Sequence, residues 1–210
     1  MLFALAFNGV FAEYKTINTK YFSIVYETSS ERAASHLAEN ADKIADELFT
    51  YYSVKPFKSK FPIFLKPFEE NLNGYYTSAP YQHIVLYDTV PVDNVLSNTT
   101  DTLLAVFTHE LTHAITMKGV FSITRPLAIR EGVTVITESL HGEGRLNDPR
   151  VKQLLAQDKF DGTFFQWNQI DMRDTVPGAS LGYLYGGAFS HTGRFSLFYI
   201  LNLFISTFSA

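Results

Sequence analysis

Two histidines four positions apart bracket a glutamate near the middle of the chain. The stretch spans residues 108–113 and reads T-H-E-L-T-H, with histidine at positions 109 and 113. On an α-helix such positions lie on one face, one turn apart. The imidazoles of His109 and His113 can therefore hold one tetrahedral zinc ion between them. Glu110 is rotated by about 100° from His109 on an ideal helix, so its carboxylate can reach a zinc-activated water and act as the general base without being a ligand.

This interpretation requires that the histidines stand on a helix, and the flanking residues favour one. Residues 101–117 contain no Gly or Pro, and Thr99, Thr100 or Asp101 can cap the start. One side of the run is apolar at helical spacing and consists of Leu103, Phe107, Leu111 and Ala114. We expect that side to pack on a core and the histidine side to look into a cleft. The alternative is a buried helix with two satisfied histidines, but the motif arises by chance in roughly 1 % of such chains or fewer.

A catalytic zinc site needs a third protein ligand and one open position. The residues after His113 lack the H-x-x-G-x-x-H extension of metzincins. The best candidate is Glu131, which follows after enough chain for a helix end, a loop and a second helix, with Pro126 suited to the first turn of that helix. Two imidazoles and a carboxylate form a ligand set that catalytic zinc uses. The alternatives are that Glu131 is a surface residue, or that Glu138, close to the same helical face, takes its place.

Three segments together resemble the gluzincin clan of zinc metallopeptidases. They are H-E-L-T-H at 109–113, P-x-x-x-x-E-G at 126–132 and G-R-L-N-D-P at 144–149. The chain is most similar to peptidase MA-like domains, relatives of the M1 aminopeptidase catalytic domain, over about residues 21–188, although the family's usual Trp before E-G is absent. The resemblance implies an α+β, zincin-like metallopeptidase fold. Its parts are a small N-terminal mixed sheet, the active-site helix and a mostly helical C-terminal lobe, truncated if the tail of the chain is aberrant.

The resemblance also implies features of the substrate site. Gluzincins often use a downstream Tyr or His to stabilise the oxyanion, and the stretch 181–189 offers Tyr183 and Tyr185, with His191 as the alternative. Both tyrosines are equally well explained as core aromatics with polar tips. In the family, the strand before the active-site helix borders the substrate cleft. A peptide backbone is therefore expected to add by β-augmentation at residues 76–86.

The composition is that of a globular, single-domain chain. The 210 residues are 46 % hydrophobic and 18 % charged. A net charge of −4 without any basic run argues against a nucleic-acid partner. The lack of cysteine excludes disulfides and thiolate zinc ligands. The remaining histidines, at positions 36, 83 and 141, are expected in ordinary surface or core roles.

The two ends of the chain differ from its body. Residues 1–12 are apolar and end in a signal-peptidase-like pattern but lack a basic start, so a signal-peptide remnant competes with a first strand or short helix. The first interpretation predicts a periplasmic, cell-envelope or secreted protein, and the second a cytoplasmic one. The peptidase domain is expected over 13–194. Residues 195–210 form an apolar tail, too short for the ~20 residues of a spanning helix, and either a buried or interfacial segment or a truncated reading frame explains it.

The expected elements follow the order of a gluzincin N-lobe. Strands are predicted over 20–27, 61–66 and 84–88, with a helix from about 29 to 52 after the first and a turn at 73–74. Beyond the second active-site helix we expect a loop over 142–149, a short helix over 151–157 and an irregular aromatic segment over 160–172.

The sequence as a whole predicts a metallopeptidase with one catalytic zinc ion and a peptide or protein substrate. The ligands are His109, His113 and Glu131, with Glu110 as general base. The absence of a G-x-M-E-N stretch favours endopeptidase action. The competing hypothesis is a catalytically inactive zincin-fold binding domain of the cell envelope, which the intact Glu110 opposes and the unusual tail supports. An intramembrane protease is set aside, since charged and polar residues such as Lys118 interrupt any apolar span and no stable membrane span is predicted.

Overall fold

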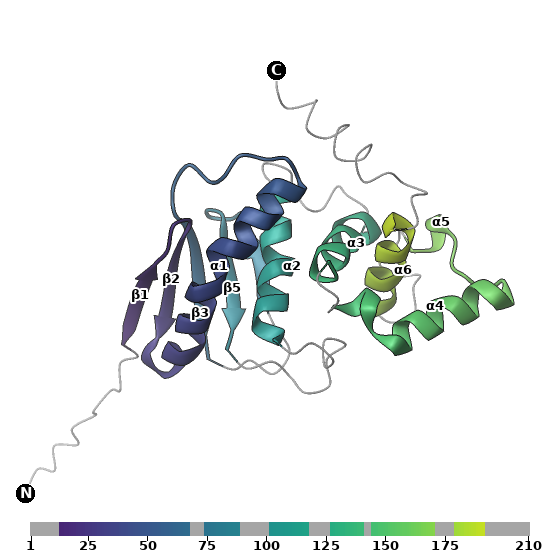
Figure 1. Ribbon diagram of the computed structural model, residues 1–210, viewed down its shortest axis with the longest axis horizontal. Helices are drawn as coiled ribbons and strands as arrows, with labels where there is room; N and C mark the ends of the chain where they lie inside the picture. Colours follow the sequence, from purple (N-terminus) through teal and green to yellow (C-terminus); the bar gives the residue numbers. More distant parts are fainter. Residues whose placement is uncertain are drawn as a thin grey trace, which may run out of the picture.

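The computed structural model describes residues 13–67, 74–88, 101–117, 127–140, 144–170 and 179–191. A mixed sheet of five strands occupies one end of this part of the chain, and a group of helices occupies the other (Figure 1). The strand order is β1-β2-β3-β5-β4, with parallel pairs β2–β3 and β3–β5 and an antiparallel strand at each edge. The strands are β1 (Tyr14–Asn18), β2 (Phe22–Glu27), β3 (Phe61–Lys66), β4 (Gly74–Thr77) and β5 (His83–Tyr87).

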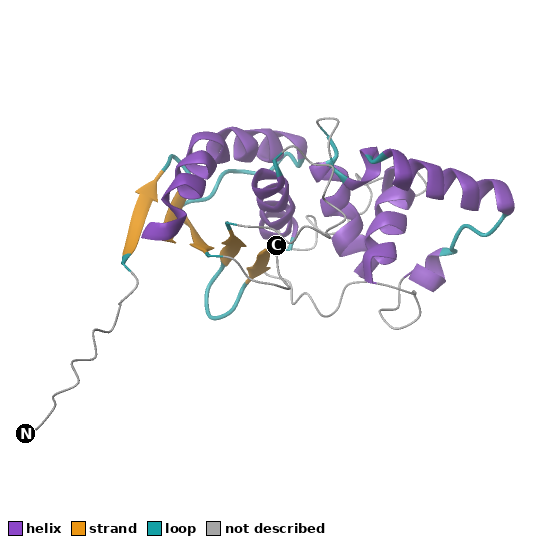
Figure 2. Cartoon of the chain, turned by 90° about the horizontal axis from the view of Figure 1, so that it is seen from below, coloured by secondary structure: helices purple, strands orange, loops and turns teal. Residues whose placement is uncertain are grey.

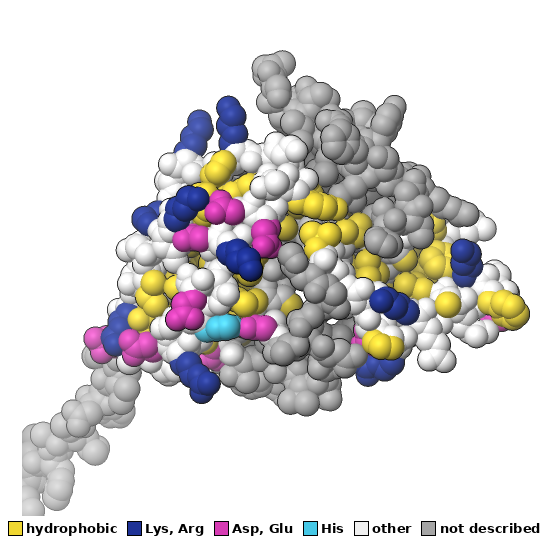
Figure 3. Space-filling view, in the orientation of Figure 1, with side chains coloured by type: hydrophobic (Ala, Val, Ile, Leu, Met, Phe, Trp, Pro, Cys, Tyr) yellow, Lys and Arg dark blue, Asp and Glu magenta, His cyan; other side chains and the backbone are white. Residues whose placement is uncertain are grey.

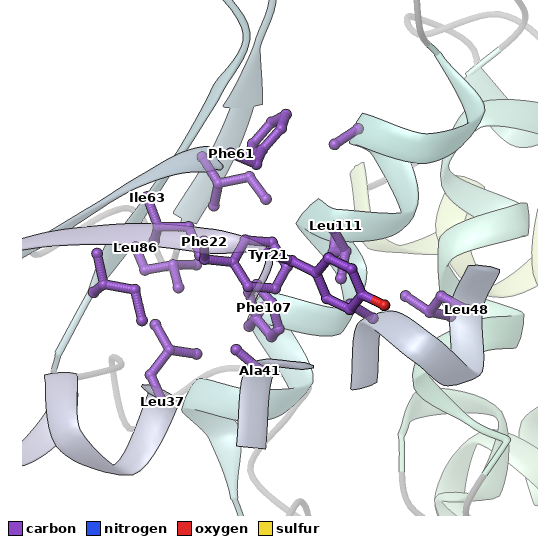
Figure 4. Close-up of a cluster of buried hydrophobic side chains, with 14 of the residues drawn as sticks. Tyr21, Phe22, Leu37, Ala41, Leu48, Phe61, Ile63, Leu86, Phe107 and Leu111 are labelled. Atoms are coloured by element: carbon purple, nitrogen blue, oxygen red, sulfur yellow. The ribbon is translucent and has the colours of Figure 1, made fainter. Parts of the chain in front are cut away.

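The main core lies between one face of the sheet and two helices. Along β2 the buried residues Phe22, Ile24 and Tyr26 alternate with half-buried ones, so only one face of the strand packs inward. Helix α1 (Glu31–Tyr51) is the crossover that the parallel pair β2–β3 requires. It and α2 (Thr102–Thr116) cover this same face (Figure 2). The aromatic ring of Phe22 meets that of Phe107 edge-to-face at 5.4 Å, which joins sheet and α2 at the centre of the cluster in Figure 4.

Helix α2 is held at its start and along its apolar side. The predicted cap is confirmed, because the Asp101 carboxylate accepts a hydrogen bond from the Leu104 N–H at 3.0 Å. The same carboxylate contacts the His36 ring on α1, so the cap also ties the two helices together. Phe107, Leu111 and Ala114 are fully buried in the core, as the periodicity predicts. The position and rotation of this helix are thereby set by the sheet.

The helices beyond α2 begin with α3, which packs between α2 and α6 (Figure 1). They are α3 (Leu127–Glu138), the 3₁₀ turn η3 (Arg145–Asn147), α4 (Pro149–Asp161), α5 (Trp167–Ile170) and α6 (Ala179–His191). The backbones of α3 and α6 touch where glycines face each other. A Cβ on Gly132 would lie 2.5 Å from the carbonyl carbon of Gly186, and a Cβ on Gly186 would lie 2.3 Å from the Ala128 oxygen. Glycine at these positions therefore lets α6 approach α3 on both sides of Glu131.

The structure differs from the sequence-based expectation in several local features. The edge strands β1 and β4 are not predicted, and Gly74 opens a strand instead of completing a turn. The helix expected from about 29 begins at Glu31, and the hydroxyl of the N-cap residue Ser30 makes no capping bond but donates to Asp88 at 2.7 Å. Helix α4 is longer than the predicted segment 151–157, and α5 interrupts the stretch 160–172 that we expected to be irregular. The expected signal-peptide remnant at 1–12 and the tail at 195–210 lie outside the described residues.

The distribution of charged side chains and the apolar character of the helices complete the description of the fold. On the face shown in Figure 3, acidic and basic side chains are interspersed over the sheet and α1. Within the described ranges, no helix has both the length and the apolar character needed to cross a bilayer.

The turn between β1 and β2 depends on one carboxylate of α1. Asp42 accepts hydrogen bonds from the Thr19 hydroxyl at 2.8 Å and from the N–H groups of Lys20 and Tyr21 at 2.8 and 3.0 Å. Asp42→Ala leaves these donors unpaired, and we expect a loss of about 1–3 kcal/mol in the free energy of unfolding, measured by urea denaturation. Glu39→Ala, an exposed change on the same helix, is the control and should be nearly neutral. Equal stability of the two variants would refute this role of Asp42.

Candidate metal centre

The contact between α2 and α3 is a polar seam inside the protein. Glu131, Thr134 and Glu138 follow one another at helical spacing along α3 and face the histidines of α2, and all are buried. His109 is 5 % exposed and His113 is 7 % exposed. The sequence predicted that the histidine face would look into a cleft, whereas in the structure it is covered by α3. Two packed helices normally bury apolar side chains, so this concentration of ionisable groups requires another explanation.

Three side chains in this seam converge on one point. The Nε2 atoms of His109 and His113 lie 3.3 and 3.1 Å from the same Glu131 oxygen, Oε2. One donor atom from each of the three residues lies within 4.8 Å of the others. Ligand atoms about 2.0–2.1 Å from a tetrahedral zinc ion are separated by roughly 3.3 Å. The three side chains predicted as zinc ligands are thus close enough to share one metal ion.

The other nitrogen of His109 is held by a second carboxylate. His109 Nδ1 and Glu138 Oε2 are 3.0 Å apart, and the Glu138 side chain is completely buried. If Nδ1 donates this hydrogen bond, the lone pair of the neutral ring lies on Nε2, which is the atom that faces Glu131. Glu138 was the alternative third ligand in the sequence analysis; in the structure it contacts the far side of the imidazole. The Nδ1 of His113 has no hydrogen-bond partner among the described residues.

The buried carboxylates control the protonation of His109, although Arg130 and Arg145 lie within ion-pair distance of Glu131 and Glu138. Burial lowers the pKa of His109, but the hydrogen-bonded carboxylates of Glu131 and Glu138 outweigh burial and raise the pKa to about 9. Burial likewise raises the pKa of Glu131, and its hydrogen bonds to His109 and His113 outweigh that effect and hold the pKa well below its usual range. The cluster therefore attracts positive charge, which either a proton on His109 or a divalent metal ion can supply.

Glu110 lies beside the cluster and is oriented by the sheet. Its Oε2 accepts a hydrogen bond from the backbone N–H of Tyr76 at 2.8 Å, and the residue is 7 % exposed. Tyr76 belongs to β4, which pairs with β5 along one side only and is the edge of the sheet. The edge strand and α2 together fix the carboxylate next to the histidines.

The two tyrosines predicted near the site lie in different surroundings. The Tyr183 ring lies nearly parallel to the His109 ring, with the ring centres 6.0 Å apart. Burial, followed by the charge of Glu131, raises the pKa of Tyr183 to about 12, so its hydroxyl remains protonated and able to donate near neutral pH. Tyr185 points elsewhere: its hydroxyl donates to Asp158, and its ring packs against Phe164 and Phe165. The side chain of His191, the alternative, lies outside the described residues.

Two residues of the centre were missed by sequence reasoning. Thr134 Oγ1 lies 3.1 Å from His109 Nε2 and donates to the Glu131 carbonyl at 2.7 Å. Thr134 lies three residues after Glu131 and therefore on the same face of the helix, which is the sequence signal that could have identified it. Arg145 lies against Glu138, with Nε 3.0 Å from Oε1. Its position depends on the chain returning to the end of α3, which no local pattern encodes.

The chain is similar in sequence to part of a longer protein and in structure to part of an aminopeptidase N family protein. No family model matches the chain. An uncharacterised protein of Treponema pallidum is 33 % identical over 177 residues, which cover 83 % of this chain and 17 % of that protein. The chain thus corresponds to a small part of this longer relative. Among solved structures, an aminopeptidase N family protein from Idiomarina loihiensis matches with a TM-score of 0.36 and 13 % identity, over 60 % of this chain and 24 % of that one.

The raised pKa of His109 predicts a pH dependence for the metal-free protein. The pKa of His109 is about 9 in the folded state against 6.5 ordinarily, so protonation of this ring favours folding. That contribution is complete below pH 6.5 and is lost as the pH rises to 9. We expect the free energy of unfolding in the presence of a chelator to fall over this interval. Urea denaturation at several pH values measures it, and the decline should be smaller in His109→Gln. The same decline in both proteins would contradict the assignment.

Proposed function

We propose that this chain is a zinc-dependent metallopeptidase domain that hydrolyses internal bonds of peptides or proteins. The observation that carries the proposal is the convergence of His109, His113 and Glu131, with Glu110 directly after His109 on the same helix. In a hydrolytic metal site, the ligands hold the cation and a separate carboxylate acts as the base. A buried cluster that attracts a cation, with the Glu110 carboxylate beside it, matches this arrangement.

The donor set supports zinc among the divalent ions. Two imidazole nitrogens and one carboxylate oxygen are a set that catalytic zinc accepts, whereas magnesium and calcium prefer oxygen donors alone. Because the chain contributes three donors, a tetrahedral ion keeps one position for water or substrate. When bound there, zinc would polarise the scissile carbonyl and lower the pKa of a water molecule.

Glu110 is suited to move the proton in this reaction. The Tyr76 amide holds its Oε2 at 2.8 Å, which limits rotation of the carboxylate and keeps it beside the histidines. From there it can accept a proton from the attacking water and deliver it to the leaving amine. A carboxylate placed by a backbone amide is better oriented than one on a free side chain, and orientation is the main requirement for a general base.

Tyr183 is the preferred donor to the developing oxyanion. Its hydroxyl is protonated at working pH and its ring lies against that of a metal ligand. Such a donor stabilises negative charge that appears on the carbonyl oxygen in the transition state. Tyr185 is unsuitable for this role because Asp158 already accepts from its hydroxyl.

Peptide binding along the sheet edge is consistent with this arrangement. Strand β4 is the edge strand nearest to Glu110, and an extended peptide can add to such an edge through main-chain hydrogen bonds. A preference for internal bonds rests on the absence of a G-x-M-E-N stretch in the sequence. The alternative function, a zincin-fold domain that binds without hydrolysis, is distinguished by the first experiment below.

Zinc content and peptidase activity test the proposal together. We expect one zinc ion per chain in the purified protein and in Glu110→Gln. Glu131→Gln should lose the zinc, because of these two glutamates only Glu131 is a proposed ligand. Hydrolysis of a casein-type substrate should fall by a factor of about 10² to 10⁴ in Glu110→Gln, the usual contribution of a general base. Zinc in the parent without hydrolysis would favour the binding function. A parent that takes up no zinc would refute the metal centre.

The two tyrosines give a matched pair of hydroxyl deletions. Tyr183→Phe removes the proposed oxyanion donor, and we expect kcat to fall by a factor of about 10² to 10³ with KM little changed. Tyr185→Phe removes a hydroxyl bonded to Asp158, so it should lower thermal stability and leave kcat near the parent value. Steady-state kinetics with a fluorogenic peptide and a thermal melt measure both. The reverse pattern would assign the catalytic hydroxyl to Tyr185.

A further inference from the structure

The turn that follows α3 is folded back onto the end of that helix. Gly144 has a φ of +85°, and a Cβ there would lie 2.5 Å from the Glu138 carbonyl oxygen. The Leu146 N–H donates to the Ser139 hydroxyl at 3.3 Å, and the Asn147 amide donates to the Ser139 carbonyl at 2.6 Å. These contacts cap the carbonyl end of α3. They also fix the backbone on both sides of Arg145.

The position of Arg145 fixes one oxygen of the Glu138 carboxylate. Its Nε lies 3.0 Å from Glu138 Oε1, an ion-pair distance without a straight hydrogen bond, and its backbone N–H donates to the same oxygen at 3.3 Å. The other oxygen, Oε2, contacts His109 Nδ1 at 3.0 Å. Because Oε1 is held from two nitrogens, the carboxylate cannot rotate freely, and Oε2 stays directed at the imidazole. The effect of Arg145 on the edge of the His109 ring thus passes through Glu138.

The same guanidinium also lies over the ring of Tyr183. Its central carbon is 4.9 Å from the ring centre, a cation–π distance, and the Arg145 side chain is 14 % exposed. Tyr183 also neighbours His109, whose ring is inclined by 24° to it. Arg145 therefore acts on the imidazole from two directions, on its edge through Glu138 and on its face through Tyr183.

We propose that Arg145 is a positioning residue of the metal centre, which orients the His109 imidazole and the Tyr183 ring without touching metal or substrate. This inference rests on the proposed metal centre. Partners of metal-ligating histidines typically change metal affinity by a factor of 10 to 100 when they are removed, and Arg145 supports two such partners. Loss of the guanidinium is expected to weaken zinc binding within that range and to change the coordination geometry.

Metal affinity and the cobalt spectrum test the proposal without relying on turnover. Zinc affinity is measured by competition with a chromophoric chelator, and the visible absorption of the cobalt(II)-substituted 210-residue chain reports ligand geometry. Arg145→Met should bind zinc 10- to 100-fold more weakly and shift the cobalt bands. Arg145→Lys, which keeps the charge but not the planar fork, should recover part of the affinity. Arg150→Met is the control, since this arginine is 69 % exposed and pairs with Asp148 away from the centre.

A double-mutant cycle separates positioning from a general loss of stability. If Arg145 acts through Glu138, Arg145→Met should cause little further loss of zinc affinity in a Glu138→Gln background. Equal losses in both backgrounds, with unchanged cobalt bands, would show a merely structural role and overturn the inference. Parent-like zinc affinity in Arg145→Met would overturn it directly while leaving the metal centre intact. A parent that binds neither ion would remove the proposed function and this inference with it.

Discussion

Two buried carboxylates of α3, which contact the two nitrogens of the His109 ring, require positive charge. Glu131 and Glu138 have side-chain exposures of 8 % and 0 %. An unpaired buried carboxylate costs several kcal/mol in the folded state. Arg145 supplies one compensating charge at Glu138. At Glu131, the Arg130 Nη2 atom lies 3.9 Å from Oε1. The other oxygen, Oε2, faces the histidines, where a proton on His109 or a metal ion would supply positive charge, and these two cations compete for the same Nε2 lone pair.

Helices α2 and α3, which carry the two sides of the centre, are each anchored to a different part of the structure. Helix α2 is fixed to the sheet by apolar contacts, with Phe107 and Leu111 fully buried. Helix α3 is fixed to α6, where Gly132 and Gly186 bring the backbones together. Between α2 and α3, Val133 packs in the main core with residues of α2, and polar contacts such as the 2.8 Å hydrogen bond between the Thr112 and Thr137 hydroxyls lie beside it. A metal ion ligated from both helices would add a further link between them, so metal binding and stability should be linked.

The parts of the site that could be predicted are those set by spacing along one helix. The histidine pair, Glu110 and the Asp101 cap depend on local periodicity, which a single sequence displays. Edge strands β1 and β4 pair with the strands next to them in the sequence, but neither contains a buried residue, so they lack the apolar alternation that marks a strand. Arg145 was missed because its approach to Glu138 depends on the backbone turn at Gly144, which periodicity does not reveal. The choice between Tyr183 and Tyr185 was left open, although residues two apart on a helix do not share a face; only one of them could have lain beside His109.

The position of Glu110 is the feature that a purely structural seam would not need. Its hydrogen-bond donor is the neutral amide of Tyr76, and the charge that it senses is that of the neighbouring His109. An apolar side chain of similar size at this position would often stabilise a fold more. The cluster of His109, His113 and Glu131 alone would suffice to hold a metal ion and to join α2 to α3. A second carboxylate, held beside that cluster by the sheet edge and oriented by a backbone amide, adds nothing to metal retention. Under the proposed function it would serve as the base toward a polarised water, and this is the reason for proposing hydrolysis rather than binding alone.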